Sequence, residues 1–160
     1  MQTTKRQKGF TLIEVLVVIA IIAILAAIVL VAINPAKRFQ DARQSQRHAN
    51  VESILSAVQQ NMVDNKGIFT CTGGVTLSST PTDIASSGGV DLTKCIASYL
   101  AILPYDPSAT NAKWNSSSDY DTKYSISQNA TGQVTVSAQS EVDENGDGKV
   151  DSNDLVSVTR

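Results

Sequence analysis

The chain has 160 residues, a formal net charge of −2 at pH 7, two cysteines and a single histidine. Once the long apolar segment near the amino terminus is set aside, about 125 residues remain, enough for one small domain. The small net charge gives no sign of a nucleic-acid partner, and one histidine excludes a metal site built on a pair of histidines.

The chain begins with a basic stretch and continues into a long apolar one. Residues 1–9 are polar, carry three basic side chains and have no core to pack in, so we exclude them from the fold. From Val15 to Ile33 no side chain is polar. A helix over Phe10–Ile33 would be ~36 Å long, enough to cross a hydrocarbon layer of roughly 30 Å. We therefore predict a transmembrane helix over residues 10–34.

Glu14 is the only charged residue inside this apolar stretch. An unpaired carboxylate in lipid costs on the order of 2.5–3.5 kcal/mol on insertion scales, so we expect it to have a function. An ordinary secretory signal has a shorter apolar core, although a cut near Ala32 stays an alternative. Three basic residues precede the stretch and four follow it, so the charge count does not settle the orientation.

The order of residues around Gly9 carries a family resemblance. The segment Lys8-Gly9-Phe10-Thr11-Leu12-Ile13-Glu14-Val15, followed by the apolar stretch, resembles the type IV prepilin signature. The resemblance implies that a prepilin peptidase cuts after Gly9, that residues 1–9 are a leader peptide, and that Phe10 becomes an N-methylated amino terminus. It also implies that Glu14 guides assembly by attracting the positive amino terminus of a neighbouring subunit. The alternative is a Glu14 side chain that only reaches out to the membrane interface.

Helical periodicity resumes after Asn34-Pro35, where we expect a kink or a loosened turn. Residues 35–66 are predicted to continue the helix in amphipathic form, ending near Asn65-Lys66-Gly67. One face is apolar and carries Val51, Ile54, Leu55, Val58 and Met62. The opposite face is expected to carry Arg43, Arg47, Asn50, Ser53 and Gln60. His48 is expected to be exposed on this helix.

Residues 67–160 are predicted to form a globular head. Residues 67–92 are rich in Gly, Ser and Thr and read as a long connecting loop. A short helix is expected over Thr93–Leu103, ended by Pro104. Cys71 and Cys95 most simply form a disulfide in an exported domain, worth about 3–4 kcal/mol in the chain-entropy model. Two free buried thiols are the alternative.

The rest of the head shows the alternation of strands. Tyr124 and Ile126 share one face, Val134 to Ala138 alternate again after the turn at residues 129–132, and residues 155–158 fit a third strand. Asp119 and Asp121 read as part of a polar loop. The expected fold class is therefore α+β, with a long amino-terminal helix packed against a small antiparallel sheet. The resemblance implies that this is a type IV pilin-like fold.

Residues 143–154 form a calcium-type loop. Oxygen ligands fall at loop positions one, three, five, nine and twelve, namely Asp143, Asn145, Asp147, Asp151 and Asp154. Lys149 would add its backbone carbonyl, and Gly148 at position six permits the sharp turn. Position twelve is Asp instead of the usual Glu, and the flanks look like strands, so this is an EF-hand-like loop without the helices. We predict a structural calcium ion; a solvated acidic turn is the alternative.

These features predict a structural subunit of a type IV pilus or a related filament, not an enzyme. The precursor is expected in the inner (cytoplasmic) membrane with one membrane pass, and the assembled form in an extracellular filament or a periplasmic pseudopilus. Expected partners are copies of itself, a prepilin peptidase and the assembly machinery of the inner membrane. Alternatives are a pseudopilin of a type II secretion system, a minor pilin, and a calcium-binding domain held permanently on the membrane.

Overall fold

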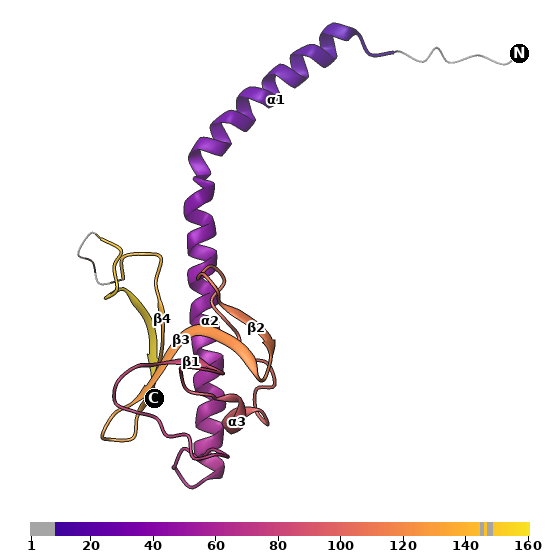
Figure 1. Cartoon of the computed structure of the whole chain (residues 1–160). Helices are drawn as coiled ribbons and strands as arrows, with labels where there is room; N and C mark the ends of the chain where they lie inside the picture. The colour runs from indigo at the N-terminus through magenta and orange to yellow at the C-terminus, as the bar shows by residue number, and fades with distance from the viewer. Residues whose placement is uncertain (1–8, 145, 147–148) are drawn as a thin grey trace, which may run out of the picture. The chain divides into compact units, whose positions relative to one another are not determined.

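The computed structural model describes residues 9–144, 146 and 149–160 (Figure 1). The chain divides into an amino-terminal unit that ends at Phe39 and a head unit, Gln40–Arg160. The helices and strands in chain order are α1 (Leu12–Ile33), α2 (Pro35–Asp64), β1 (Thr82–Ala85), α3 (Thr93–Ile96), β2 (Lys113–Ser116), β3 (Asp119–Gln128), β4 (Val134–Gln139) and β5 (Leu155–Thr159). The α+β class with a long amino-terminal helix and a small antiparallel sheet is confirmed.

The helix α1 is apolar around its whole circumference. None of its residues is buried within the chain, and its side chains leave no polar face. In the part of the chain that the structure describes, it is the one helix long and apolar enough to span a membrane. A helix without a polar face has no preferred side for water, so its apolar surface needs lipid or another protein.

The predicted kink at Asn34-Pro35 is a break between two helices. Asn34 has a left-handed backbone with φ 45°, which ends α1 at Ile33. The Asn34 side chain accepts a hydrogen bond from the Lys37 amide at 3.4 Å, and its carbonyl accepts one from the Arg38 amide at 3.3 Å. Pro35 is favourable as the first residue of α2 because a helix gives that position no use for an N–H.

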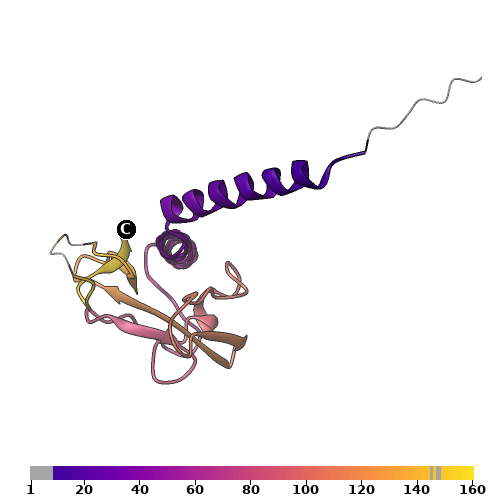
Figure 2. The same ribbon diagram turned by 90° about the horizontal axis from the view of Figure 1, so that it is seen from above.

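The apolar face of α2 forms one layer of the head core. Val51, Ile54, Leu55 and Val58 are fully buried, as the periodicity predicts. The other layer is the inner face of the sheet, and Figure 2 shows α2 end-on beside it. The buried side chains of the sheet that complete the core include Ile84, Tyr120, Tyr124, Ile126, Val134, Val136 and Val156. The helix ends where Gly67, with φ 88°, donates its amide to the Met62 carbonyl at 2.7 Å.

The polar face predicted for α2 is partly wrong. Ser53, Gln60 and His48 are exposed, but Arg47 and Asn50 are buried. Each lies four residues before a core position, Val51 or Ile54, and so faces the same side of the helix. Gln44 and Asn61 extend this buried polar set toward the two ends of the head.

The antiparallel sheet has the order β1-β3-β4-β5, with β2 pairing with the start of β3. The three predicted strands are present as β3, β4 and β5, and the pairs Ile126↔Val136 and Val136↔Val158 set their register. The predicted turn at residues 129–132 joins β3 to β4, with Gly132 at φ 89°. Strand alternation therefore places Tyr124 and Ile126 of β3, Val134 and Val136 of β4 and Val156 of β5 toward α2, whereas Leu155 of β5 is exposed.

Three local predictions in the head are corrected. Residues 67–92 are not entirely loop, because β1 pairs with β3. Asp119 and Asp121 lie in β3 instead of a polar loop, since the strand starts five residues before Tyr124. The helix predicted over Thr93–Leu103 is limited to α3, and the chain continues in turns. The predicted Cys71–Cys95 disulfide is present and ties the segment after α2 to α3.

Candidate functional site

The predicted processing junction lies in an exposed segment before α1. Residues 1–8 of the predicted leader lie outside the described residues. Among the described residues, no atom beyond Gly9 and its chain neighbours lies within 4 Å of the position that a Cβ at Gly9 would take, and Phe10 is 89% exposed. A peptidase therefore meets no steric obstacle from the rest of the described chain at the Gly9–Phe10 bond.

Glu14 closes a capping box at the start of α1. Its carboxylate Oε2 accepts hydrogen bonds from the Thr11 amide at 2.7 Å and the Thr11 hydroxyl at 2.8 Å. The Glu14 amide donates in return to the Thr11 hydroxyl at 3.3 Å. Thr11 was missed as a site residue, although Thr-x-x-Glu before an apolar stretch is a sequence signature of this cap. The structure thus brings Phe10, Thr11 and Glu14 together within one helical turn.

A second polar cluster lies on α2 inside the head, around Arg47. The guanidinium bonds both carboxylate oxygens of Asp106, with Nε at 2.6 Å and Nη2 at 3.1 Å. Nη2 also lies 2.6 Å from the Ser108 hydroxyl and 2.6 Å from the Glu141 carboxylate. The Arg47 and Asp106 side chains are only 3% and 2% exposed. Every charge of this cluster has a partner of opposite sign, which a buried charge requires.

Two neighbours on α2 hold the segment that follows β4. Arg43 binds the Glu141 carboxylate through Nε at 2.8 Å and Nη2 at 2.5 Å. The Gln44 side-chain amide donates to the Glu144 carboxylate at 2.6 Å. Contacts from Arg43, Gln44 and Arg47 therefore fasten the start of the β4–β5 loop to the helix.

These contacts set the protonation of two carboxylates. Hydrogen bonds from Arg43, and then from Arg47 and Ser108, outweigh partial burial and lower the pKa of Glu141 to about 2. Burial alone would raise the pKa of Asp106. The bonds from Arg47 and from the Ser108 and Ala109 amides outweigh burial and lower that pKa below its usual value. Both carboxylates are therefore anionic at neutral pH.

The predicted calcium loop is the connection between β4 and β5. Asp154 is fully buried, and its carboxylate accepts the Glu144 amide at 2.7 Å and the Asp151 amide at 2.8 Å. The Asp143 carboxylate accepts the Gly146 amide at 2.6 Å. The last predicted ligand thus lies inside the loop and draws its two ends together. The ligand atoms that the predicted set would offer to a metal ion are all oxygens, which a hard cation prefers.

Part of this ligand set cannot be placed. Asn145, Asp147 and the turn glycine Gly148 lie outside the described residues. Within the described part of the chain, no three histidine, cysteine or acidic side chains are grouped closely enough to hold a metal ion. Calcium at this loop therefore stays a prediction.

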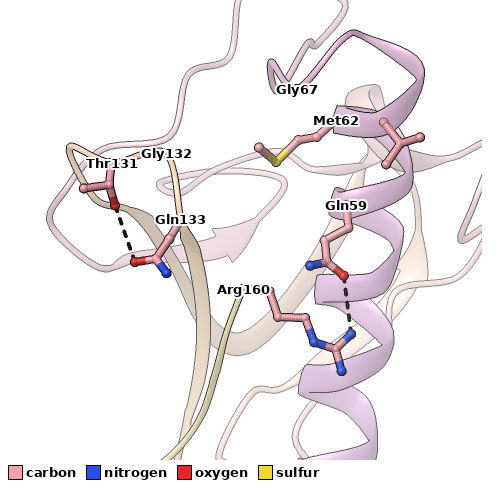
Figure 3. A pocket seen from close by; sticks show the side chains of 8 residues that line it. Gln59, Met62, Gly67, Thr131, Gly132, Gln133 and Arg160 are labelled. Carbon is pink, nitrogen blue, oxygen red and sulfur yellow. Dashed lines mark hydrogen bonds between the residues drawn. The ribbon is translucent and has the colours of Figure 1, made fainter.

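A groove of the head lies between the end of α2 and the β3–β4 turn (Figure 3). It has a volume of about 660 Å³, and Met62 and Val63 supply much of its apolar lining. Its one charged lining residue, Arg160, points to Gln59 at 3.4 Å and also binds Glu52 at 2.9 Å. The lining holds no acid, histidine or cysteine, so this groove has no nucleophile–base pair.

Comparison with known proteins bears on the amino terminus. A family model described as the prokaryotic N-terminal methylation motif matches residues 4–30. The chain carries a prepilin-type amino terminus. No curated protein and no solved structure matches the chain. The matched motif supports a type IV pilin-like family of structural subunits, and with α1 it indicates a membrane-anchored precursor that a prepilin peptidase processes.

Proposed function

We propose that the chain is the structural subunit of a type IV pilus or a related filament. The precursor is cleaved after Gly9, methylated at the new amino terminus Phe10, and polymerised through α1. The observation that carries this proposal is the methylation motif over residues 4–30, which includes most of α1, a helix that buries none of its own residues. An apolar helix with no buried residue in the described part of the chain fits burial first in lipid and then among copies of itself.

Glu14 is the proposed registration residue of the assembly. Among featureless apolar helices, one carboxylate and one free amino terminus attract strongly when water is excluded, and either one alone is costly. The capping box supports a precursor in which Thr11 satisfies the Glu14 carboxylate until a neighbouring subunit arrives. Thr11 is thereby a positioning residue for Glu14.

A pair of matched variants tests the processing step. Gly9→Leu places a side chain at the cut bond and is expected to leave the precursor at full length, with no extracellular filaments. Gln7→Leu adds the same side chain two residues earlier and is expected to be processed normally. The sizes of the membrane-bound and extracellular forms are read on a gel. Normal processing and filament yield from Gly9→Leu would contradict the proposal.

The same fractionation separates the alternatives. A processed chain that stays in the membrane fraction favours a pseudopilin of a type II secretion system or a minor pilin. If the wild-type chain stays unprocessed in the membrane, the result favours a permanently anchored calcium-binding domain. A chain in sheared extracellular material favours the pilus subunit.

We further propose a structural calcium ion at residues 143–154. The supporting observation is the inward position of Asp154, whose carboxylate bonds amides at both sides of the loop. Asp143, Asn145, Asp147, Asp151, Asp154 and the Lys149 carbonyl would hold the ion. Bound calcium would neutralise the acidic loop and stabilise the head by about 2.7 kcal/mol at a hundredfold excess over Kd.

Thermal unfolding of the head with calcium or with a chelator tests this second proposal. Calcium is expected to raise the Tm of the wild type and of Ser152→Ala, which changes a loop position without a ligand. Asp147→Ala should lose the shift. An equal shift in Asp147→Ala, or no shift in the wild type, would contradict the calcium site.

A further inference from the structure

The strand β5 is one edge of the head sheet, and its outer side is open. Arg160 and Val134 exchange backbone hydrogen bonds at 2.8 and 3.0 Å, and the Ser140 amide donates to the Asp154 carbonyl at 2.8 Å. Along a strand, the backbone N–H and C=O groups of successive residues point to alternate sides. Those of residues 154, 156, 158 and 160 therefore point toward β4. The N–H and C=O groups of Leu155, Ser157 and Thr159 therefore point away from the sheet. Among the described residues, none bonds these outward groups.

The other edge of the sheet is closed by the chain itself. The Val90 amide donates to the Asp83 carbonyl at 2.7 Å, and the Ala85 amide donates to the Val90 carbonyl at 3.2 Å. A register irregularity interrupts β1 between Asp83 and Ala85. Bulges and covering segments are the usual protection of an edge strand. β5 has neither: its residues are uncharged, it contains no proline, and its pairing with β4 is regular.

The sequence of β5 is nearly the same read in either direction about Ser157. In an antiparallel pair of two β5 strands centred on Ser157, Val156 of one copy lies opposite Val158 of the other. Leu155 of one copy lies opposite Thr159 of the other, and Ser157 lies opposite Ser157. The pair therefore places valine opposite valine and brings no charged side chain of β5 against another.

We infer that the β5 edge is a docking surface for a second copy of this chain. The two β5 strands join as antiparallel neighbours across a two-fold axis at Ser157, and the sheets of the two heads become continuous. The surface is self-complementary, as a two-fold contact requires. It satisfies the outward N–H and C=O groups of Leu155, Ser157 and Thr159 in both copies.

The direction of β5 decides which copies can meet in this way. Near the start of β5, the β4–β5 loop contacts Gln44, whereas Arg160 at its end contacts Glu52 and Gln59. β5 therefore runs in the same direction as α2 within the head. The two-fold contact sets the two α2 helices antiparallel. Subunits of one filament are expected to point the same way, so this contact joins copies of different filaments.

Cysteine cross-linking of the full-length protein in detergent tests the contact. In Ser157→Cys, the two introduced thiols face each other across the axis with a Cα separation of about 5.5 Å, within disulfide range. In the matched control Thr159→Cys, the same pairing offsets the two thiols by four residues, about 13 Å along the strand. Mild oxidation is expected to give a covalent dimer from Ser157→Cys alone. Equal dimer from both variants, or none from either, would overturn the inference.

A charge exchange at the same position provides a second test without oxidation. Ser157→Lys and Ser157→Asp each place like charges directly opposite one another, and each is expected to weaken dimerisation about fivefold. An equimolar mixture should restore the dimer, because Lys then faces Asp. Ser157 is exposed, so neither variant disturbs the core. Sedimentation of the three samples reads the result, and a mixture no more dimeric than either variant alone would overturn the inference.

Discussion

The two helices α1 and α2 differ in where their apolar side chains lie. α1 buries none of its residues, whereas α2 buries Val51, Ile54, Leu55 and Val58 completely. The sheet of the head covers the apolar face of α2, whereas no residue of α1 is buried in the described part of the chain. The head therefore forms its own core, whereas the apolar surface of the amino-terminal helix requires lipid or other protein molecules around it. Changes in the head should therefore alter its unfolding, and changes in α1 should alter assembly alone.

The largest effect on the head is expected from Arg47→Ala. It leaves the buried Asp106 carboxylate without its cation, which costs about 3–5 kcal/mol of unfolding free energy. Denaturant unfolding can be followed through the fluorescence of Trp114, the only tryptophan, which lies 5.1 Å from the Tyr120 ring. Arg43→Ala is the matched control, because solvent screens its partly exposed ion pair and the expected loss is much smaller. Equal losses in the two variants would contradict the distinction.

Removal of the disulfide is expected to have a similar but slightly smaller effect. Cys71 and Cys95 are 24 residues apart, so the double change to serine should lower the unfolding free energy by about 3–4 kcal/mol. Reduction of the wild type should give the same loss, and a reductant should not affect the double variant. A double variant as stable as the oxidised wild type would show that the bridge does not constrain the unfolded head.

Acid is expected to weaken the head through Asp106. Its pKa is lowered in the folded head relative to about 3.9 in the unfolded chain. The stabilisation is therefore present above pH 4 and is lost as the pH falls through the folded pKa. The unfolding free energy should decline below pH 4, and Asp106→Asn should decline less steeply while being less stable at pH 7. Parallel pH curves for both proteins would assign the acid sensitivity to other groups.

The smallest effect on head stability is expected from Glu14→Ala, since Glu14 lies outside the head unit. The variant should be processed and inserted in the membrane, with an unchanged unfolding curve of the head, yet yield few filaments. Thr11→Ala provides a graded comparison, because it removes the hydroxyl of the cap but keeps the backbone amide donor and the Glu14 carboxylate. A normal filament yield from Glu14→Ala would refute the registration role.

Local patterns predicted the parts of the fold that depend on local chemistry. The apolar stretch predicted α1, the periodicity of Val51 to Val58 predicted the core face of α2, and alternation predicted β3, β4 and β5. The burial of Arg47 was not predictable, because its partners Asp106 and Glu141 are 59 and 94 residues away. β1 was missed because a strand of four residues is determined by its pairing with β3 and not by its own pattern.

The residues of the candidate site also divide into those within one local sequence motif and those that only the tertiary fold brings together. Gly9, Phe10 and Glu14 form one contiguous motif, so a single stretch of sequence was enough to predict them. The Thr11–Glu14 capping box has an equally clear sequence pattern but was not identified from the sequence. The polar cluster that fastens the β4–β5 loop combines α2 with residues 106–108 and 141–144, which only the tertiary fold brings together. The role of the calcium-type loop depends on an ion that the sequence predicts by spacing alone.

The mass of the native chain in sheared extracellular filaments tests the central claim most directly. The account predicts a chain that begins at Phe10, carries one added methyl group and is abundant in this fraction. A chain that keeps residues 1–9, or one that begins near Ile33, would contradict it, because α1 would then be a permanent anchor or a discarded signal instead of the core of an assembly.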